Sequence, residues 1–92
     1  MNVLLIGSGG REHALAWKIS RSPLLGALHA IPGSAAISGL AECPPIAQSD
    51  FESILAYAVK NKIDLAVIGP EEPLAKGLAD ILSAAGFKVF GP

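Results

Sequence analysis

The sequence predicts an α/β fold built on an open, mostly parallel sheet with helices on both faces. Three observations lead to this prediction. Short continuous runs of Val, Ile and Leu are typical of strands that are covered on both faces. Segments with apolar residues at helical spacing alternate with these runs, as crossover connections between parallel strands require. Hydrophobic residues make up 51% of the 92 residues and aromatic residues only 5%, so we expect a core of small aliphatic side chains.

Length and composition exclude several classes of protein. A chain of 92 residues is long enough for one core and therefore one domain. Seven basic and eight acidic side chains, with no basic cluster, argue against a nucleic-acid partner. The apolar run Val3–Ile6 is too short for a signal peptide, and no stretch is long enough to cross a membrane. The single cysteine, Cys43, is compatible with a reducing compartment, so we expect a cytoplasmic protein.

The first elements follow from the N-terminal half. Val3–Ile6 is expected to be a central strand, because its apolar run is continuous. A helix is expected from about Gly10, and it ends before Pro23 because the residue before a proline disfavours helix. Residues 27–31 read as a second strand.

The next segment contains the weakest signals. Residues 34–39 show no clear period and are expected to form a loop. Residues 41–47 include Pro44 and Pro45, which cannot donate to a sheet, so any strand there is short and lies at an edge.

Sharper signals return in the C-terminal half. Ser49 and Glu52 have the spacing of a capping box, which predicts a helix that begins there and runs to about Asn61. Residues 63–68 form another apolar run and are expected to be a buried strand. A third helix is expected to begin near Pro73 and to end at Gly86 as a left-handed C-cap. Its buried apolar face is expected to consist of Leu74, Leu78, Ile81 and Leu82. Residues 87–90 complete the sheet.

The alternation predicts about five strands in the order 3-2-1-4-5, a Rossmann-like arrangement. Ligands of such sheets bind beyond the carboxyl ends of the strands, where the strand order reverses. Two loops, residues 7–13 and residues 69–73, are therefore expected to lie side by side.

The first of these loops has the composition of an anion site. Gly9 and Gly10 leave the backbone accessible, and N–H groups at the start of a helix carry partial positive charge. Ser8 adds a hydroxyl donor and Arg11 a guanidinium group. The alternative is that the glycines only permit a tight turn. We interpret the loop as a phosphate site.

Two classes of phosphate-containing ligand fit the sequence poorly. A dinucleotide fingerprint places glycine where this chain has Glu12, and it needs an acidic residue after the second strand, where residues 31–34 offer none. No Gly-Lys-Ser/Thr follows, which excludes an ATP-binding P-loop. A small phosphorylated molecule remains, with a nicotinamide dinucleotide-binding module as the alternative.

The second loop is expected to complete the site with acceptor groups. Pro70 and Glu71 directly follow the fourth strand, and the Glu71 carboxylate can accept hydrogen bonds from sugar hydroxyls or an amine. Glu72 serves equally well as a helix cap. We expect His13 and Trp17 to be structural, with Trp17 packed between helix and sheet.

Three stretches, "VLLIGSGGREHALAWKI", "IDLAVIGPEEPLAKGLAD" and "GFKVFGP", resemble the N-terminal domain of the phosphoribosylamine–glycine ligase family, ATP-grasp enzymes also called glycinamide ribonucleotide synthetases. The resemblance covers essentially the whole chain. It implies a pre-ATP-grasp domain and an enzyme of purine biosynthesis that joins glycine to 5-phosphoribosylamine with ATP. The resemblance further implies that the reaction passes through a glycyl phosphate.

The resemblance also implies which domain of the enzyme binds each ligand. Residues 1–92 would be a single N-terminal substrate-binding domain in which Ser8, Gly9, Gly10 and Arg11 bind the phosphoribosyl substrate. Pro70 and Glu71 would meet its ribose or amine. ATP and Mg or Mn would bind in the ATP-grasp and C-terminal domains, which lie outside this segment. We therefore expect no catalytic or metal-binding residue here, partners in the remaining domains of the enzyme, and no ligase activity from the segment alone.

Overall fold

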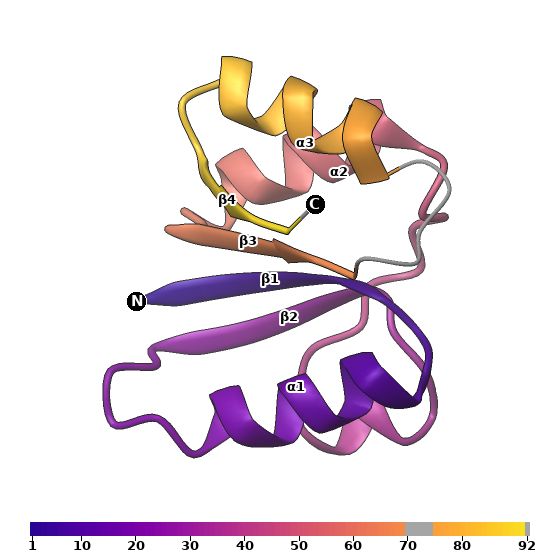
Figure 1. The fold of residues 1–92 in the computed structure, drawn as a ribbon, viewed down its shortest axis with the longest axis vertical. Coiled ribbons are helices and arrows are strands. Elements are labelled where there is room, and N and C mark those ends of the chain that lie inside the picture. The colour runs from indigo at the N-terminus through magenta and orange to yellow at the C-terminus, as the bar shows by residue number, and fades with distance from the viewer. Residues whose placement is uncertain (70–74, 92) are drawn as a thin grey trace.

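A computed structural model describes residues 1–69 and 75–91, without the side chains of residues 75 and 76. Its centre is a sheet of four parallel strands in the order β2-β1-β3-β4 (Figure 1). The elements are β1 (Asn2–Gly7), α1 (Gly10–Ser20), β2 (Ala27–Pro32), the short 3-10 helix η1 (Ile37–Gly39), α2 (Phe51–Lys60), β3 (Leu65–Ile68), α3 (Ala75–Ala84) and β4 (Lys88–Phe90). None of the helices in the described part of the chain is long and apolar enough to span a membrane.

The predicted fold class is confirmed, but the predicted number of five strands is wrong. Residues 41–47 form no strand and pair with β2 only through a bridge at Glu42. There the Ala30 N–H donates to the Glu42 carbonyl at 2.8 Å, and the Glu42 N–H donates to the Leu28 carbonyl at 3.0 Å. Pro44 and Pro45 have no N–H, so the pairing cannot extend. The bridge lies beside β2, where the edge strand was expected, and the other four strands have the predicted order.

The sheet separates two apolar layers. Figure 1 shows α1 on one face and both α2 and α3 on the other. Side chains of β1 alternate between the faces, so that Val3 and Leu5 join the cluster beneath α1, and Leu4 and Ile6 join the cluster beneath α2 and α3. As predicted, β1 is a central strand, since it pairs with β2 on one side and β3 on the other.

Helix ends follow local hydrogen bonding. The N-cap of α2 is Asp50 and not Ser49, because the Ser53 N–H donates to Asp50 Oδ1 at 3.2 Å and the Ser53 hydroxyl donates to Oδ2 at 2.7 Å. The C-terminal end of α3 is as predicted: Gly86 has φ +94°, and the Phe87 N–H donates to the Leu82 carbonyl at 3.1 Å. Pro73, the predicted start of α3, lies outside the described residues.

Two side chains that were expected to be buried are exposed. Trp17 is 53% exposed on α1, where the Arg21 guanidinium lies 4.9 Å from the centre of its ring. Ile81, on α3, is 37% exposed. Trp17 therefore contributes a cation–π contact on the helix surface rather than packing against the sheet.

Candidate functional site

The carboxyl ends of the strands meet at one edge of the sheet, as the topology predicted. Ile6 of β1 lies opposite Ile68 of β3, and the Gly69 N–H donates to the Ile6 carbonyl at 3.1 Å. The Gly33 N–H, after β2, donates to the Gly7 carbonyl at 3.2 Å. The start of the second predicted loop therefore lies beside the first. Pro70 and Glu71, the predicted site residues of that loop, lie outside the described residues.

The glycine turn opens to solvent between β1 and α1. Gly7 ends β1 with φ +143°, a conformation that side chains rarely allow. Gly9 is the N-cap of α1, and Ser8, Gly9, Gly10 and Arg11 are all exposed. A Cβ at Gly10 would have no atom within 4 Å, so the start of the helix is unobstructed. The first N–H groups of a helix have no acceptor within the helix, which makes this turn a place where an anion can bind.

Glu12 is the residue that the sequence interpretation missed. Its side chain turns back toward the strands, and its Oε1 accepts a hydrogen bond from the Gly9 N–H at 3.3 Å. A Cβ on Gly7 would overlap the Glu12 side chain, and a Cβ on Gly69 would come within 3.2 Å of its Cδ. The Glu12 carboxylate thus lies between the ends of β1 and β3, in space that two glycines leave open.

A signal for this arrangement was present in the sequence. Glu at the third position of a helix commonly reaches back to the N-cap N–H, and Gly7 and Gly69 each follow an apolar strand. Sequence reasoning treated Glu12 only as a break in the dinucleotide fingerprint. Its position was not predictable until the two strand ends were known to be adjacent.

Among the described residues, the arrangement combines several hydrogen-bond donors with the Glu12 carboxylate as an acceptor. N–H groups at the start of α1, the Ser8 hydroxyl and the Arg11 guanidinium can hold an anion, while the Glu12 carboxylate can accept hydrogen bonds from hydroxyl or amine groups. A ligand with one phosphate and several hydroxyl or amine donors matches both.

Other candidate groups lie elsewhere. His13 is exposed on the first turn of α1, and Cys43 is half-buried against Gly33. Within the part of the chain that the structure describes, no three His, Cys, Asp or Glu side chains are grouped closely enough to hold a metal ion.

Comparison with known protein sequences identifies the family of this chain. The family model for the N domain of phosphoribosylglycinamide synthetase matches residues 1–92. A phosphoribosylamine–glycine ligase from Agrobacterium fabrum is 55% identical over 92 residues, which are all of this chain and 22% of that protein. The trifunctional purine biosynthetic protein adenosine-3 from Drosophila melanogaster is 47% identical over 95 residues, covering 98% of this chain and 7% of that protein. The chain thus spans about a fifth (22%) of the length of the Agrobacterium ligase.

Solved structures show the same fold at low identity. A Rex-family repressor, RSP, superposes with a TM-score of 0.68 and 24% identity, covering 98% of this chain and 44% of that one. The same repressor in complex with beta-NADH superposes with a TM-score of 0.66 and 22% identity. At such identities the likeness concerns the Rossmann-like fold alone.

Proposed function

The chain belongs to the phosphoribosylglycinamide synthetase N-domain family, and from this premise we propose that residues 1–92 form the N-terminal substrate-binding domain of a phosphoribosylamine–glycine ligase. On this proposal the complete enzyme joins glycine to 5-phosphoribosylamine in purine biosynthesis, in the cytoplasm. ATP and Mg or Mn bind in its other domains, and this domain presents the phosphoribosyl substrate to them.

The observation that carries the proposal is the position of Glu12 beside an open glycine turn. The substrate has one phosphate at one end and hydroxyl and amine groups at the other. We assign the phosphate to the start of α1, with Ser8, Gly9, Gly10 and Arg11, and the hydroxyl or amine groups to Glu12. Pro70 and Glu71 belong to the same proposed site by resemblance to the family.

The proposed contact suits the chemistry of the amine. In the ligase reaction the ribosylamine nitrogen attacks an activated glycine, and for this it needs its lone pair. A carboxylate that accepts an N–H hydrogen bond from the amine fixes the direction of that lone pair. Glu12 would then orient the nucleophile rather than form a bond with the substrate.

Ribose 5-phosphate, which has the phosphate and ribose but no amine, tests the binding site directly. We expect titration of the isotopically labelled chain to shift the amide signals of residues 8–12. We expect Arg11→Ala to weaken binding by about tenfold, as the loss of a hydrogen bond to a charged group does. Lys60→Ala removes a basic side chain at the end of α2, away from the turn, and serves as the control. Shifts confined to other residues, or equal losses in both variants, would contradict the proposed site.

The competing function is a nicotinamide dinucleotide-binding module. RSP, which shares the fold, has been solved with beta-NADH, but this chain carries Glu12 where the dinucleotide fingerprint needs glycine. We therefore expect the fluorescence of NADH to stay unchanged in the presence of the chain at millimolar cofactor. A saturable change would favour the dinucleotide over the sugar phosphate.

A further inference from the structure

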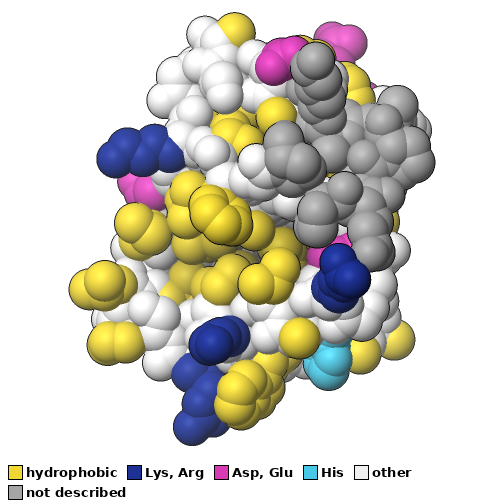
Figure 2. Space-filling view, viewed as in Figure 1, with side chains coloured by type: hydrophobic (Ala, Val, Ile, Leu, Met, Phe, Trp, Pro, Cys, Tyr) yellow, Lys and Arg dark blue, Asp and Glu magenta, His cyan; other side chains and the backbone are white. Residues whose placement is uncertain are grey.

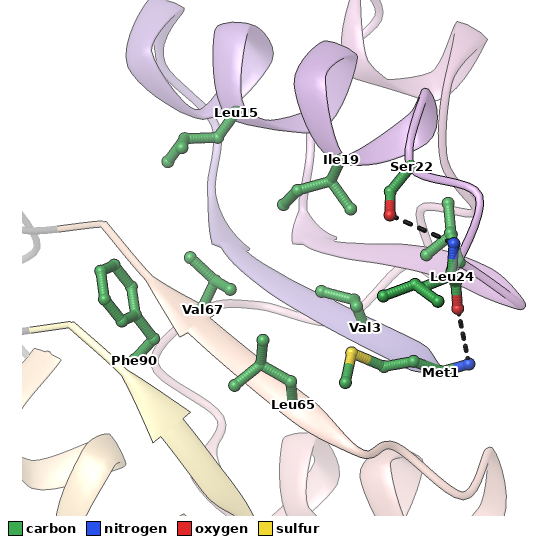
Figure 3. A pocket seen from close by; sticks show the side chains of 10 residues that line it. Met1, Val3, Leu15, Ile19, Ser22, Leu24, Leu65, Val67 and Phe90 are labelled. Atoms are coloured by element: carbon green, nitrogen blue, oxygen red, sulfur yellow. Dashed lines mark hydrogen bonds between the residues drawn. The ribbon is translucent and has the colours of Figure 1, made fainter.

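An apolar hollow of about 380 Å³ lies on the α1 side of the sheet, away from the glycine turn. Strand residues form its floor, helix α1 forms one wall, and the segment after α1 closes one end. Figure 3 shows side chains from these elements converging on the hollow, among them Val3, Leu65, Val67, Phe90, Leu15 and Ile19. Its lining is almost wholly apolar, so water is a poor occupant.

The hollow exists because one face of the sheet is only half covered. On that face α1 packs on β1 and β2, and no helix among the described residues lies over β3 and β4. Parallel sheets are normally covered on both faces. Large apolar side chains are left in solvent around the hollow: Phe90 is 69% exposed, Met1 57% and Leu24 74%. In Figure 2 hydrophobic side chains form a continuous band over the strands above α1.

We propose that this hollow is the docking surface for an apolar helix from another domain of the same enzyme. The inference rests on the proposed function, that the chain is one domain of a ligase. The Agrobacterium relative has about three and a half times as much sequence outside this region as inside it, since the region is 22% of that protein. The family model is that of an N domain, so the rest of such a protein follows β4, and β4 carries Phe90 at the rim of the hollow.

A helix of the same enzyme fits better than a second copy of this domain. Its attachment close to β4 gives it a high effective concentration at the hollow, which a separate molecule lacks. A helix placed beside α1 would cover β3 and β4 and complete the second helical layer of the fold. It would need Leu, Ile or Phe side chains on the face that meets the hollow.

Thiol accessibility at the rim measures this coverage. Phe90→Cys is made in a Cys43→Ser background, and its rate of reaction with a maleimide is compared in two proteins. One is the 92-residue chain, and the other is the same chain joined to the domains that follow it in a full-length phosphoribosylamine–glycine ligase. We expect the reaction to be at least about tenfold slower in the longer protein. Leu24→Cys, on the opposite rim, is expected to be protected in the same way.

Val59→Cys supplies the matched control. Val59 is 62% exposed on α2, on the other side of the sheet, and does not line the hollow. We expect equal rates at this position in both proteins. Equal rates at position 90 or 24 would overturn the proposal. The proposal would also be overturned if the 92-residue chain had the mass of a dimer and its thiol at position 90 or 24 already reacted much more slowly than the thiol at position 59. That result would identify a second copy as the occupant. The ribose 5-phosphate titration observes the amides of the glycine turn and not the hollow. Failure of the proposed substrate site can therefore be distinguished from failure of the proposed docking surface.

Discussion

Gly7 and Gly10 belong to the same glycine turn, yet the structure predicts opposite results when each is replaced by alanine. At Gly7 the φ of +143° and the Glu12 side chain both oppose a Cβ, whereas at Gly10 nothing lies within 4 Å. We expect Gly7→Ala to lower the free energy of unfolding by about 1–3 kcal/mol. Gly10→Ala, in the first turn of α1, is expected to leave it unchanged or raise it by up to about 1 kcal/mol.

Urea unfolding of both variants checks this prediction. The double variant Gly7→Ala with Glu12→Ala separates the two causes, because it removes the obstacle and keeps the unfavourable φ. We expect Gly7→Ala to lower the free energy of unfolding less in the Glu12→Ala background than in the wild type. Equal losses in Gly7→Ala and Gly10→Ala would contradict both the φ described for Gly7 and the position described for the Glu12 side chain.

His29 and Tyr57 form the polar contact between β2 and α2. His29 is only 7% exposed, its Nδ1 lies 2.6 Å from the Tyr57 hydroxyl oxygen, and the two rings meet edge to face. Tyr57→Phe leaves the buried imidazole without this partner, which is expected to lower the free energy of unfolding by about 1–3 kcal/mol. Denaturant unfolding at pH 7 measures the loss, and a loss below about 0.5 kcal/mol would contradict it.

The same tyrosine predicts a dependence on alkaline pH. Burial, followed by the negative charges of Glu42 and Cys43, raises the pKa of Tyr57 above its ordinary value of 10.0. The folded state therefore keeps the proton at a pH where the unfolded state loses it, so stability falls as the pH rises above 10.0. We expect the advantage of the wild type over Tyr57→Phe to shrink from about pH 9 to pH 11. A constant difference across that range would argue against the raised pKa.

Single residues also mark the limit of prediction from sequence. Ser8 to Arg11 could be assigned to the site because glycines and donors at a strand–helix junction have a local meaning. The position of Glu12 depends on Gly69, which is distant in sequence and becomes a neighbour only when β1 pairs with β3. The exposure of Trp17 depends on which side of α1 meets the sheet. The apolar residues of α1, at positions 14–17 and 19, lie all around the helix and do not specify that side.

At the scale of elements, the start of α2 offers the sharpest test, because the sequence pointed to Ser49 as its cap and the structure to Asp50. We expect Asp50→Ala to lower the melting temperature, since the Ser53 N–H and hydroxyl lose their acceptor. Ser49→Ala is the matched control and is expected to change little. Thermal unfolding followed by circular dichroism compares them, and a larger effect at Ser49 would restore the cap predicted from sequence.

The pH dependence of that difference has a definite sign. Hydrogen bonds from the Ser53 side chain and then from its backbone lower the pKa of Asp50 below its ordinary value of 3.8. The contribution of the ionised cap is therefore present above pH 3.8 and is lost as the pH falls through the lowered pKa. The wild type and Asp50→Ala are expected to converge in acid.

Most elements could be predicted from sequence because each carries its own signal. The continuous apolar runs predicted β1 and β3. Gly86 predicted the end of α3 because glycine readily adopts the positive φ of a helix C-cap. The prediction of an edge strand at residues 41–47 was wrong for a different reason. Glu42 does pair with β2, but the pairing ends there because Pro44 and Pro45 have no N–H to donate. The sequence did not show how many residues would pair before the prolines.

At the scale of the whole molecule, the two faces and the one edge of the sheet have separate roles. The face under α2 and α3 is closed and holds the larger core cluster. The face under α1 is half open and carries the proposed docking surface, while the carboxyl edge carries the proposed substrate site. Because the site and the hollow share β1 and β3, a domain docked in the hollow would rest on the same strands that position Glu12 and the glycine turn.

This layout predicts how stability is distributed over the molecule, and amide hydrogen exchange measures it. β1 is hydrogen-bonded on both sides, and Leu4, Leu5 and Ile6 are at most 1% exposed, so their amides are expected to exchange only through global unfolding. The Glu42 amide belongs to a bridge that Pro44 and Pro45 prevent from extending, and it opens locally. We expect it to exchange at least about a hundredfold faster than the amide of Leu5. Equal protection would mean that residues 41–47 behave as the fifth strand after all, with the sheet edge moved outward from β2.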